Sequence, residues 1–156
     1  DSNELCCFLF VCFCVAVFAL VVFTDVALGT AGYWRLYASS PSLQAGIVSA
    51  VIEVIPGRAV QLRFDPLDVS LKTTVGEALV PAPIVRLFDA TGNNITHPNA
   101  SARIELVLAD ESNMNGGDIF GNSSAIAENG VATFDNVKFN EAGTFKRLTA
   151  TWRSHI

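Results

Sequence analysis

The sequence predicts an all-β fold, an antiparallel β-sandwich, over about the last two thirds of the chain. Short runs rich in β-branched and aromatic residues recur there, and clusters of Gly, Pro, Asn and Asp separate them. Many short strands at such spacing are typical of β-sandwiches. The predicted strands cover residues 47–55, 59–64, 69–74, 84–88, 102–108, 131–139 and 144–152.

Alternation of side chains within two of these runs supports the strand assignment. In the fifth run, Ile104, Leu106 and Leu108 point to one face, while the charged Arg103 and Glu105 point to the other. In the first run, an entirely apolar face consists of Val48, Ala50, Ile52 and Val54.

The composition excludes several classes of protein. Hydrophobic residues make up 51% of the chain and charged residues 16%, which argues against intrinsic disorder. The net charge of −5 does not suit a protein that follows nucleic-acid phosphates. No nucleophile, acid–base pair or Gly-rich phosphate loop stands out. We therefore expect no enzyme, no cofactor, no metal and no nucleic-acid partner.

The N-terminal segment is strongly apolar. The 19 residues from 5 to 23 contain no charged or strongly polar side chain, and about 17–25 such residues suffice to span a bilayer as a helix. Four interpretations stay open: a secretory signal peptide cleaved near residues 26–29, a retained membrane helix, a pilin-like helix in a filament core, and one or two buried strands.

All four cysteines lie in this apolar segment, as Cys6, Cys7, Cys12 and Cys14. Their spacing lacks the pairs of a zinc site, and no histidine is near them. We expect them to act as small buried hydrophobic side chains.

Four stretches further along the chain resemble bacterial-type Ig-like modules. They are residues 56–64, 76–93, 129–134 and 142–145, which read PGRAVQLRF, GEALVPAPIVRLFDATGN, NGVATF and AGTF. Such modules occur in tandem on microbial surface proteins and adhesins. The resemblance covers roughly residues 45–152, and it implies an Ig-like sandwich at the cell surface or outside the cell. A fold alone does not fix a function.

The last predicted strand has an echo near the start of the chain. Residues 31–39 resemble residues 142–151 with one residue gapped, and Ala, Gly, Arg, Leu and Ala are identical. In similar modules the strand that begins Ala-Gly-Thr-Phe is followed by one more, final strand. After the echo comes the predicted strand 47–55, whereas four residues remain after Trp152. We expect an Ig-like sandwich in residues 56–156 that lacks its own last strand, an extended arm in 30–55, and the apolar segment in 1–29.

This organisation has three interpretations. The chain is a piece of a tandem array, strand 47–55 folds back into its own sandwich, or the strand is donated to another subunit. In the third case the apolar face of strand 47–55 would pack into a neighbour, and the acceptor strand would present Phe145, Leu148, Ala150 and Trp152. Such head-to-tail contacts build a polymer of identical copies, similar in mechanism to donor-strand exchange in chaperone–usher pili.

Three N-x-[ST] sequons begin at Asn94, Asn99 and Asn122. All three lie in polar stretches typical of turns, where a glycan projects freely. We expect carbohydrate on at least one of them, with Asn94 and Asn99 favoured.

The sequence therefore predicts a structural subunit of an extracellular fibre or surface array, assembled by β-strand donation between copies. The alternatives are an Ig-like adhesion module anchored in a membrane by residues 5–23, and a pilin-like subunit with an N-terminal helix. A membrane is a partner only if residues 5–23 form an anchor.

Overall fold

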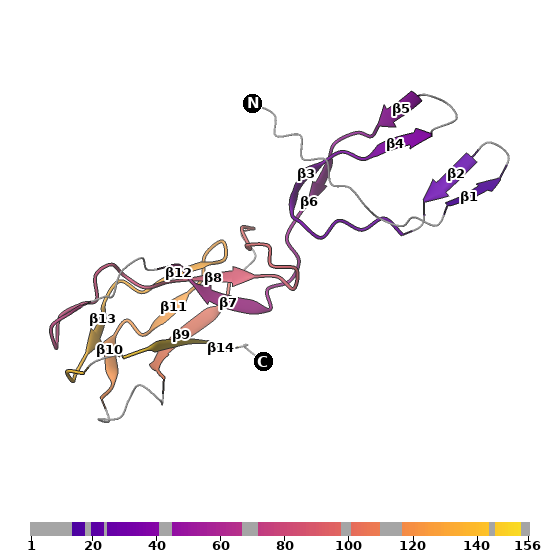
Figure 1. Cartoon of the computed structure of the whole chain (residues 1–156). Coiled ribbons are helices and arrows are strands. Elements are labelled where there is room, and N and C mark those ends of the chain that lie inside the picture. Colours follow the sequence, from indigo (N-terminus) through magenta and orange to yellow (C-terminus); the bar gives the residue numbers. More distant parts are fainter. Residues whose placement is uncertain are drawn as a thin grey trace.

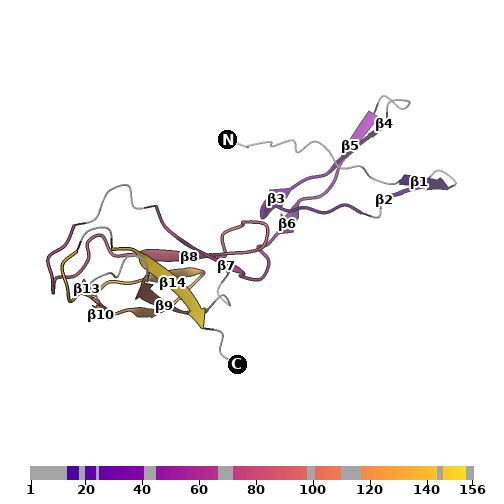
Figure 2. The same ribbon diagram turned by 60° about the horizontal axis from the view of Figure 1, so that its bottom comes forward.

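The computed structural model describes residues 14–17, 20–23, 25–40, 45–66, 72–97, 101–109, 117–143 and 146–153. Every regular element in these ranges is a β-strand, and every strand pair is antiparallel. The predicted all-β fold is thus confirmed. Figures 1 and 2 show a layered C-terminal part and an N-terminal arm of hairpins that extends away from it.

The C-terminal part contains two three-stranded sheets that face each other. One has the order β11 (Ser124–Ile126), β9 (Arg103–Leu108), β14 (Leu148–Arg153). The other has the order β12 (Val131–Thr133), β8 (Ile84–Phe88), β7 (Gln61–Phe64). A smaller pair, β10 (Ile119–Gly121) with β13 (Val137–Phe139), closes one end.

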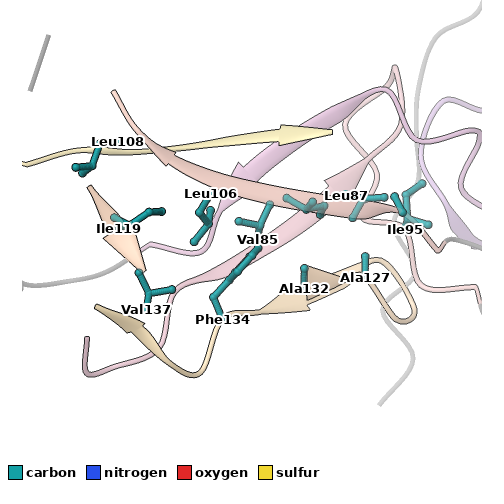
Figure 3. Packing of buried hydrophobic residues seen from close by; sticks show 12 residues of the cluster. Val85, Leu87, Ile95, Leu106, Leu108, Ile119, Ala127, Ala132, Phe134 and Val137 are labelled. Atoms are coloured by element: carbon teal, nitrogen blue, oxygen red, sulfur yellow. The ribbon is translucent and has the colours of Figure 1, made fainter. Parts of the chain in front are cut away.

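The core lies between the two sheets. Ile104, Leu106 and Leu108 are buried on one face of β9, as their alternation predicts, and Arg103 on the other face is exposed. Figure 3 shows Leu106 beside Val85 of β8, and Leu108 at the end of the cluster where Ile119 of β10 lies. The other large side chains that are almost wholly enclosed are Phe134, Leu87, Ile95, Val85, Val137 and Pro83.

Tight turns explain where several strands end. Asn129 and Gly130 have positive φ values of 50° and 76°, and they close the predicted hairpin turn before β12. A Cβ atom at Gly130 would collide with the carbonyl oxygen of Ile95, so glycine is required there.

Three predicted strands differ from the structure. The run 131–139 is two strands, because Asp135 and Asn136 form a turn between β12 and β13. The run 69–74 lies partly outside the described residues, and residues 72–74 lead into a turn closed by the Glu77 N–H donating to the carbonyl of Thr74. The run 47–55 is also two strands.

The described residues from Cys14 to Val54 pair as antiparallel strands. β1 (Cys14–Val17) pairs with β2 (Leu20–Phe23), so the strand interpretation fits this part of the apolar segment. Val22 and Phe23 are about half exposed in the single chain. The described residues contain no helix long and apolar enough to cross a membrane. Residues 1–13, which include three of the cysteines, lie outside the described ranges.

The arm is a longer hairpin. β3 (Gly32–Trp34) pairs with β6 (Ile52–Val54), and β4 (Tyr37–Ser40) pairs with β5 (Ala45–Val48). Residues of the predicted donor run thus pair with residues of the predicted echo within the same chain.

Candidate assembly interface

The outer edge of β14 has no strand partner in the described ranges, where β14 pairs with β9 alone. The backbone N–H of Ala109 donates to the carbonyl of Arg147 over 3.0 Å. The backbone groups of Arg147 therefore turn toward β9. Because bonding alternates along antiparallel strands, Leu148, Ala150 and Trp152 turn their backbone groups toward the open edge. Unpaired edge groups of this kind are templates for another strand.

The same three residues turn their side chains toward the core. They lie opposite Leu108, Leu106 and Ile104, all of which are buried. The predicted acceptor residues Leu148, Ala150 and Trp152 therefore share one face of β14. The fourth, Phe145, lies outside the described residues.

The edge strand of the facing sheet is β7, and its outer edge also has no strand partner among the described residues. Leu62 and Phe64 lie opposite the buried Leu87 and Val85, so their side chains face the core. Even so, Phe64 on β7 and Trp152 on β14 are each 37% exposed, and Leu62 is only half-buried. The two strands lie close to each other on this side of the sandwich. Their inward-facing side chains are nevertheless only partly covered by the described residues, and we call this side, between β7 and β14, the open side of the core.

Polar contacts on the outer face hold β7 against β8. Arg86 on β8 donates to both carboxylate oxygens of Asp65, which follows β7. This hydrogen-bonded pair lowers the pKa of Asp65. The guanidinium of Arg63 lies 4.4 Å from the ring centre of Phe88. These contacts fix the position of the edge strand beside the open side of the core.

The arm contains a β-bulge, which corrects the predicted donor face. Between the pairs Trp34–Ile52 and Tyr37–Val48, the first strand has two residues and the second has three. An extra residue reverses the alternation of side chains beyond it. Ile52 and Val54 therefore lie on the face of Trp34, whereas Val48 lies opposite Tyr37 on the other face. Ala50 lies within the bulge, so the four residues predicted as one face do not share one.

Large apolar side chains are concentrated on the surface of the arm. Ile47 is 73% exposed and Tyr33 74% exposed. Other exposed apolar residues of the arm are Leu36, Tyr37, Val48, Val51 and Ile55. Exposed apolar surface on this scale is typical of interaction sites, and an isolated two-stranded hairpin is at best marginally stable in water.

The turn at residues 89–93 joins the arm to the sandwich. Asp89 is buried, and its carboxylate accepts bonds of 2.8–2.9 Å from Thr91, Asn93 and the N–H of Gly57. The Asn93 amide in turn donates to the carbonyl of Gly29 over 3.0 Å and accepts from the N–H of Ala31 over 2.9 Å. One turn therefore holds both chain segments at the base of the arm.

Hydrogen bonding dominates the electrostatics of this turn. The side-chain amide of Asn93, followed by the backbone N–H of Gly57, holds the pKa of Asp89 well below its usual value. These bonds outweigh burial, which raises the pKa. The sequence shows Asp-Ala-Thr-Gly-Asn as a turn, but nothing local in it reveals the contacts to Gly29, Ala31 and Gly57.

The three sequon asparagines lie in different surroundings. The side chain of Asn122 is exposed, and its amide donates to Asp135 over 2.8 Å. Asn94 is half-buried, and its enclosed Oδ1 has no hydrogen-bond partner among the described residues. Asn99 lies outside those residues. Access for a glycan therefore favours Asn122 over Asn94.

A shallow hollow of about 380 Å³ lies where the arm meets the sandwich, beside Tyr33, Glu53, Asn93 and Asn94. The Tyr33 hydroxyl donates to the Glu53 carboxylate over 3.2 Å, and both groups are exposed. In the described part of the chain, no group of three or more His, Cys, Asp and Glu side chains could hold a metal ion.

Comparisons of this chain with protein-family models, with curated proteins and with solved structures found no match. The functional argument therefore depends on the geometry of the open core side and of the arm.

Proposed function

We propose that this protein is a structural subunit of an extracellular fibre or surface array, assembled by β-strand donation between copies. The proposal depends on one observation, the open side of the core between β7 and β14. A strand added beside β14 would bond to the outward groups of Leu148, Ala150 and Trp152 and would cover their half-exposed side chains.

The free energy gained when a strand is added beside β14 has two parts. Each new backbone bond contributes roughly 0.5–1.5 kcal/mol net. Each large apolar side chain that becomes fully buried contributes roughly 1.5–3 kcal/mol. Several of each are needed to offset the loss of translational freedom, which costs at least about 4 kcal/mol. A strand with apolar residues, such as those of the arm, meets this need.

The arm of a second copy is the proposed donor. It extends away from its own sandwich (Figure 2), it exposes apolar side chains, and residues 45–52 carry no charge. Donor and acceptor lie on different parts of the molecule, so the contact is heterologous and builds a filament unless its rotation closes a ring.

The Ig-like family and the extracellular location are part of the same proposal. They depend on the resemblance of residues 56–64, 76–93, 129–134 and 142–145 to Ig-like surface modules, and the antiparallel sandwich accords with it. The strands at 14–17 and 20–23 do not suit a pilin-like helix through those residues.

Negative-stain electron microscopy of the purified chain tests the proposal. We expect filaments from the wild type and dispersed particles from Ala150→Pro, which removes one outward N–H of β14 without breaking its bonds to β9. Ile126→Pro on β11 is the matched control. It removes an outward N–H at the opposite edge of the same sheet and should leave filaments intact. Filaments from Ala150→Pro equal to those of the wild type would exclude this edge as the acceptor.

A second experiment tests the extracellular part of the proposal. In a eukaryotic secretory host we expect Asn122 to carry a glycan, because its side chain is exposed. Intact-mass measurement before and after glycosidase treatment detects it, and Asn122→Gln removes it. A mass that glycosidase does not change would contradict this expectation.

A further inference from the structure

We infer that β3 and β4, the first half of the arm hairpin, take the place of β14 beside the donor strand. They cap the donor strand in the free chain until the β14 of a second copy replaces them. This inference depends on the proposed function. It names the strand that is donated, the register in which that strand pairs, and the contact that restrains it before assembly. It begins from the echo between residues 31–39 and 142–151. In the structure the first of these segments pairs with residues 45–54. A sequence similar to β14 therefore already has a partner strand within this chain.

The backbone bonding pattern is the same in the two segments. Leu36 corresponds to Leu148, and Ala38 corresponds to Ala150. In the arm the carbonyl of Leu36 accepts from the N–H of Ser49 over 2.8 Å. In the sandwich Leu148 turns its backbone groups to the open edge. Leu148, which would bond to the donor strand in the sandwich, is thus the counterpart of Leu36, which bonds to the donor strand in the arm.

The bulge indicates that β14 is the better partner. In the arm, three residues of the donor face two residues between Trp34 and Tyr37. In the echo, Lys146 is the additional residue, so three residues separate Phe145 from Thr149. The donor would therefore pair with β14 in one register without a bulge. The interrupted strand of the arm would become one continuous strand.

This register places specific side chains together. Val48 of one copy lies opposite Thr149 of the next, on the outer face, in the position that Tyr37 takes in the arm. Ile47 lies opposite Ala150 and faces the core. Ile47 is 73% exposed in the free arm, whereas beside Ala150 it would cover part of the open side of the core. Exchange keeps the number of ladder bonds similar and adds apolar burial, so it favours the assembled state.

The donor has to come from another copy. β14 runs toward the end of the sandwich from which the arm extends (Figure 1), and an antiparallel partner runs the opposite way. A donor from the same chain would end at the far end of β14 and would have to return to Gly57, which Asp89 holds. Residues 51–56 span about 20 Å when extended, and a six-residue strand is about 20 Å long. No residues remain for the reversal.

The register is tested by cross-linking in full-length chains. We expect Val48→Cys/Thr149→Cys to form a disulfide between copies during assembly. Peptide mapping of mixed ¹⁴N- and ¹⁵N-labelled protein identifies the linked peptides and shows that they come from different copies. Val48→Cys/Ala150→Cys is the control, because its second cysteine faces the core, and it should not form the link. A control that forms the link equally well, or a disulfide that never joins two isotopes, would overturn the register.

The cap is tested by two variants with opposite expected effects on the rate of assembly. Inserting a lysine between Trp34 and Arg35 copies Lys146 into the arm and removes the bulge, so the cap is stronger and assembly should slow several-fold. Ala38→Pro removes a bond between β4 and β5, so the cap is weaker and assembly should accelerate several-fold.

Light scattering measures both rates, and circular dichroism confirms that each sandwich is folded. If neither rate changes, or both change in the same direction, while Ala150→Pro still blocks assembly, the capping inference fails and the proposed function stands. If the wild type does not assemble at all, both fail.

Discussion

Trp152 offers a quantitative test of the open core side, because it is partly exposed in the free chain and would be covered by a donated strand. It lies opposite Ile104 on the core face of β14. An aromatic side chain buries about 200 Å² when enclosed, so an exposed fraction of 37% corresponds to about 75 Å². At about 25 cal/mol per Å², covering this area contributes about 2 kcal/mol, or roughly a 25-fold change in the association constant.

The perturbation is Trp152→Ala, and the assay has two parts. Urea unfolding of the free chain measures the loss from the part of the indole that is already buried. Sedimentation of assembled material measures the critical concentration, which we expect to rise about 25-fold because the exposed part no longer contributes to the contact. Val107→Ala is the control. Val107 is exposed on the outer face of β9, away from the open side, so it should leave the critical concentration nearly unchanged.

A fall in unfolding free energy with no change in critical concentration would refute this reasoning. The side of the core between β7 and β14 would then not be the surface that a partner covers. An equal rise for Val107→Ala would also count against it, because the effect would then come from general loss of apolar surface.

Three further predictions concern the turns. Gly130→Ala should lower the free energy of unfolding by at least about 1–2 kcal/mol in urea titrations, because φ is 76° and a Cβ would meet the carbonyl of Ile95; a neutral effect would contradict the turn geometry. Asn93→Ala removes the acceptor of the Ala31 N–H, so hydrogen exchange should accelerate at that amide while core amides stay protected. Hydrogen bonds lower the pKa of Asp89, so their contribution to stability is complete above about pH 4 and declines as pH falls. The stability difference between wild type and Asp89→Asn should therefore narrow below about pH 4, and a constant difference down to pH 2 would argue against those bonds.

The core could be predicted from the sequence because local alternation determines it. Ile104, Leu106 and Leu108 recur every second residue, and β9 buries all three. The pattern depends only on the geometry of one strand. The turn at Asn129–Gly130 could be predicted equally well, since these two residue types tolerate the positive φ that such a turn needs.

The face of the arm could not be predicted in the same way. The alternation of Val48, Ala50, Ile52 and Val54 suggests one continuous apolar face. In the structure the partner strand is one residue short between Trp34 and Tyr37, and the bulge that results separates these residues. A bulge depends on the number of residues in two strands, so the pattern of one strand does not reveal it.

The junction between arm and sandwich escaped prediction for a related reason. Asp89 and Asn93 form hydrogen bonds with residues more than 30 positions away in the chain. The sequence pattern around them fits an ordinary turn, which would leave the carboxylate exposed. Only the return of residues 29–31 and 57 to this turn encloses Asp89 and aligns its donors.

The arm and the sandwich are complementary halves of the same arrangement. The arm has a strand similar to β14 together with its partner strand but no core behind them, while the sandwich has β14 and a core but no partner strand at its outer edge in the described residues. A copy of the donor in a longer tandem chain would complete the sandwich as well as a donor from another subunit. The two cases differ only in covalent connection. A synthetic peptide with the sequence of residues 45–55 separates donation as such from connection. Strand donation requires that it bind the wild-type chain in competition with assembly, bind Ala150→Pro more weakly, and bind Ile126→Pro as it binds the wild type.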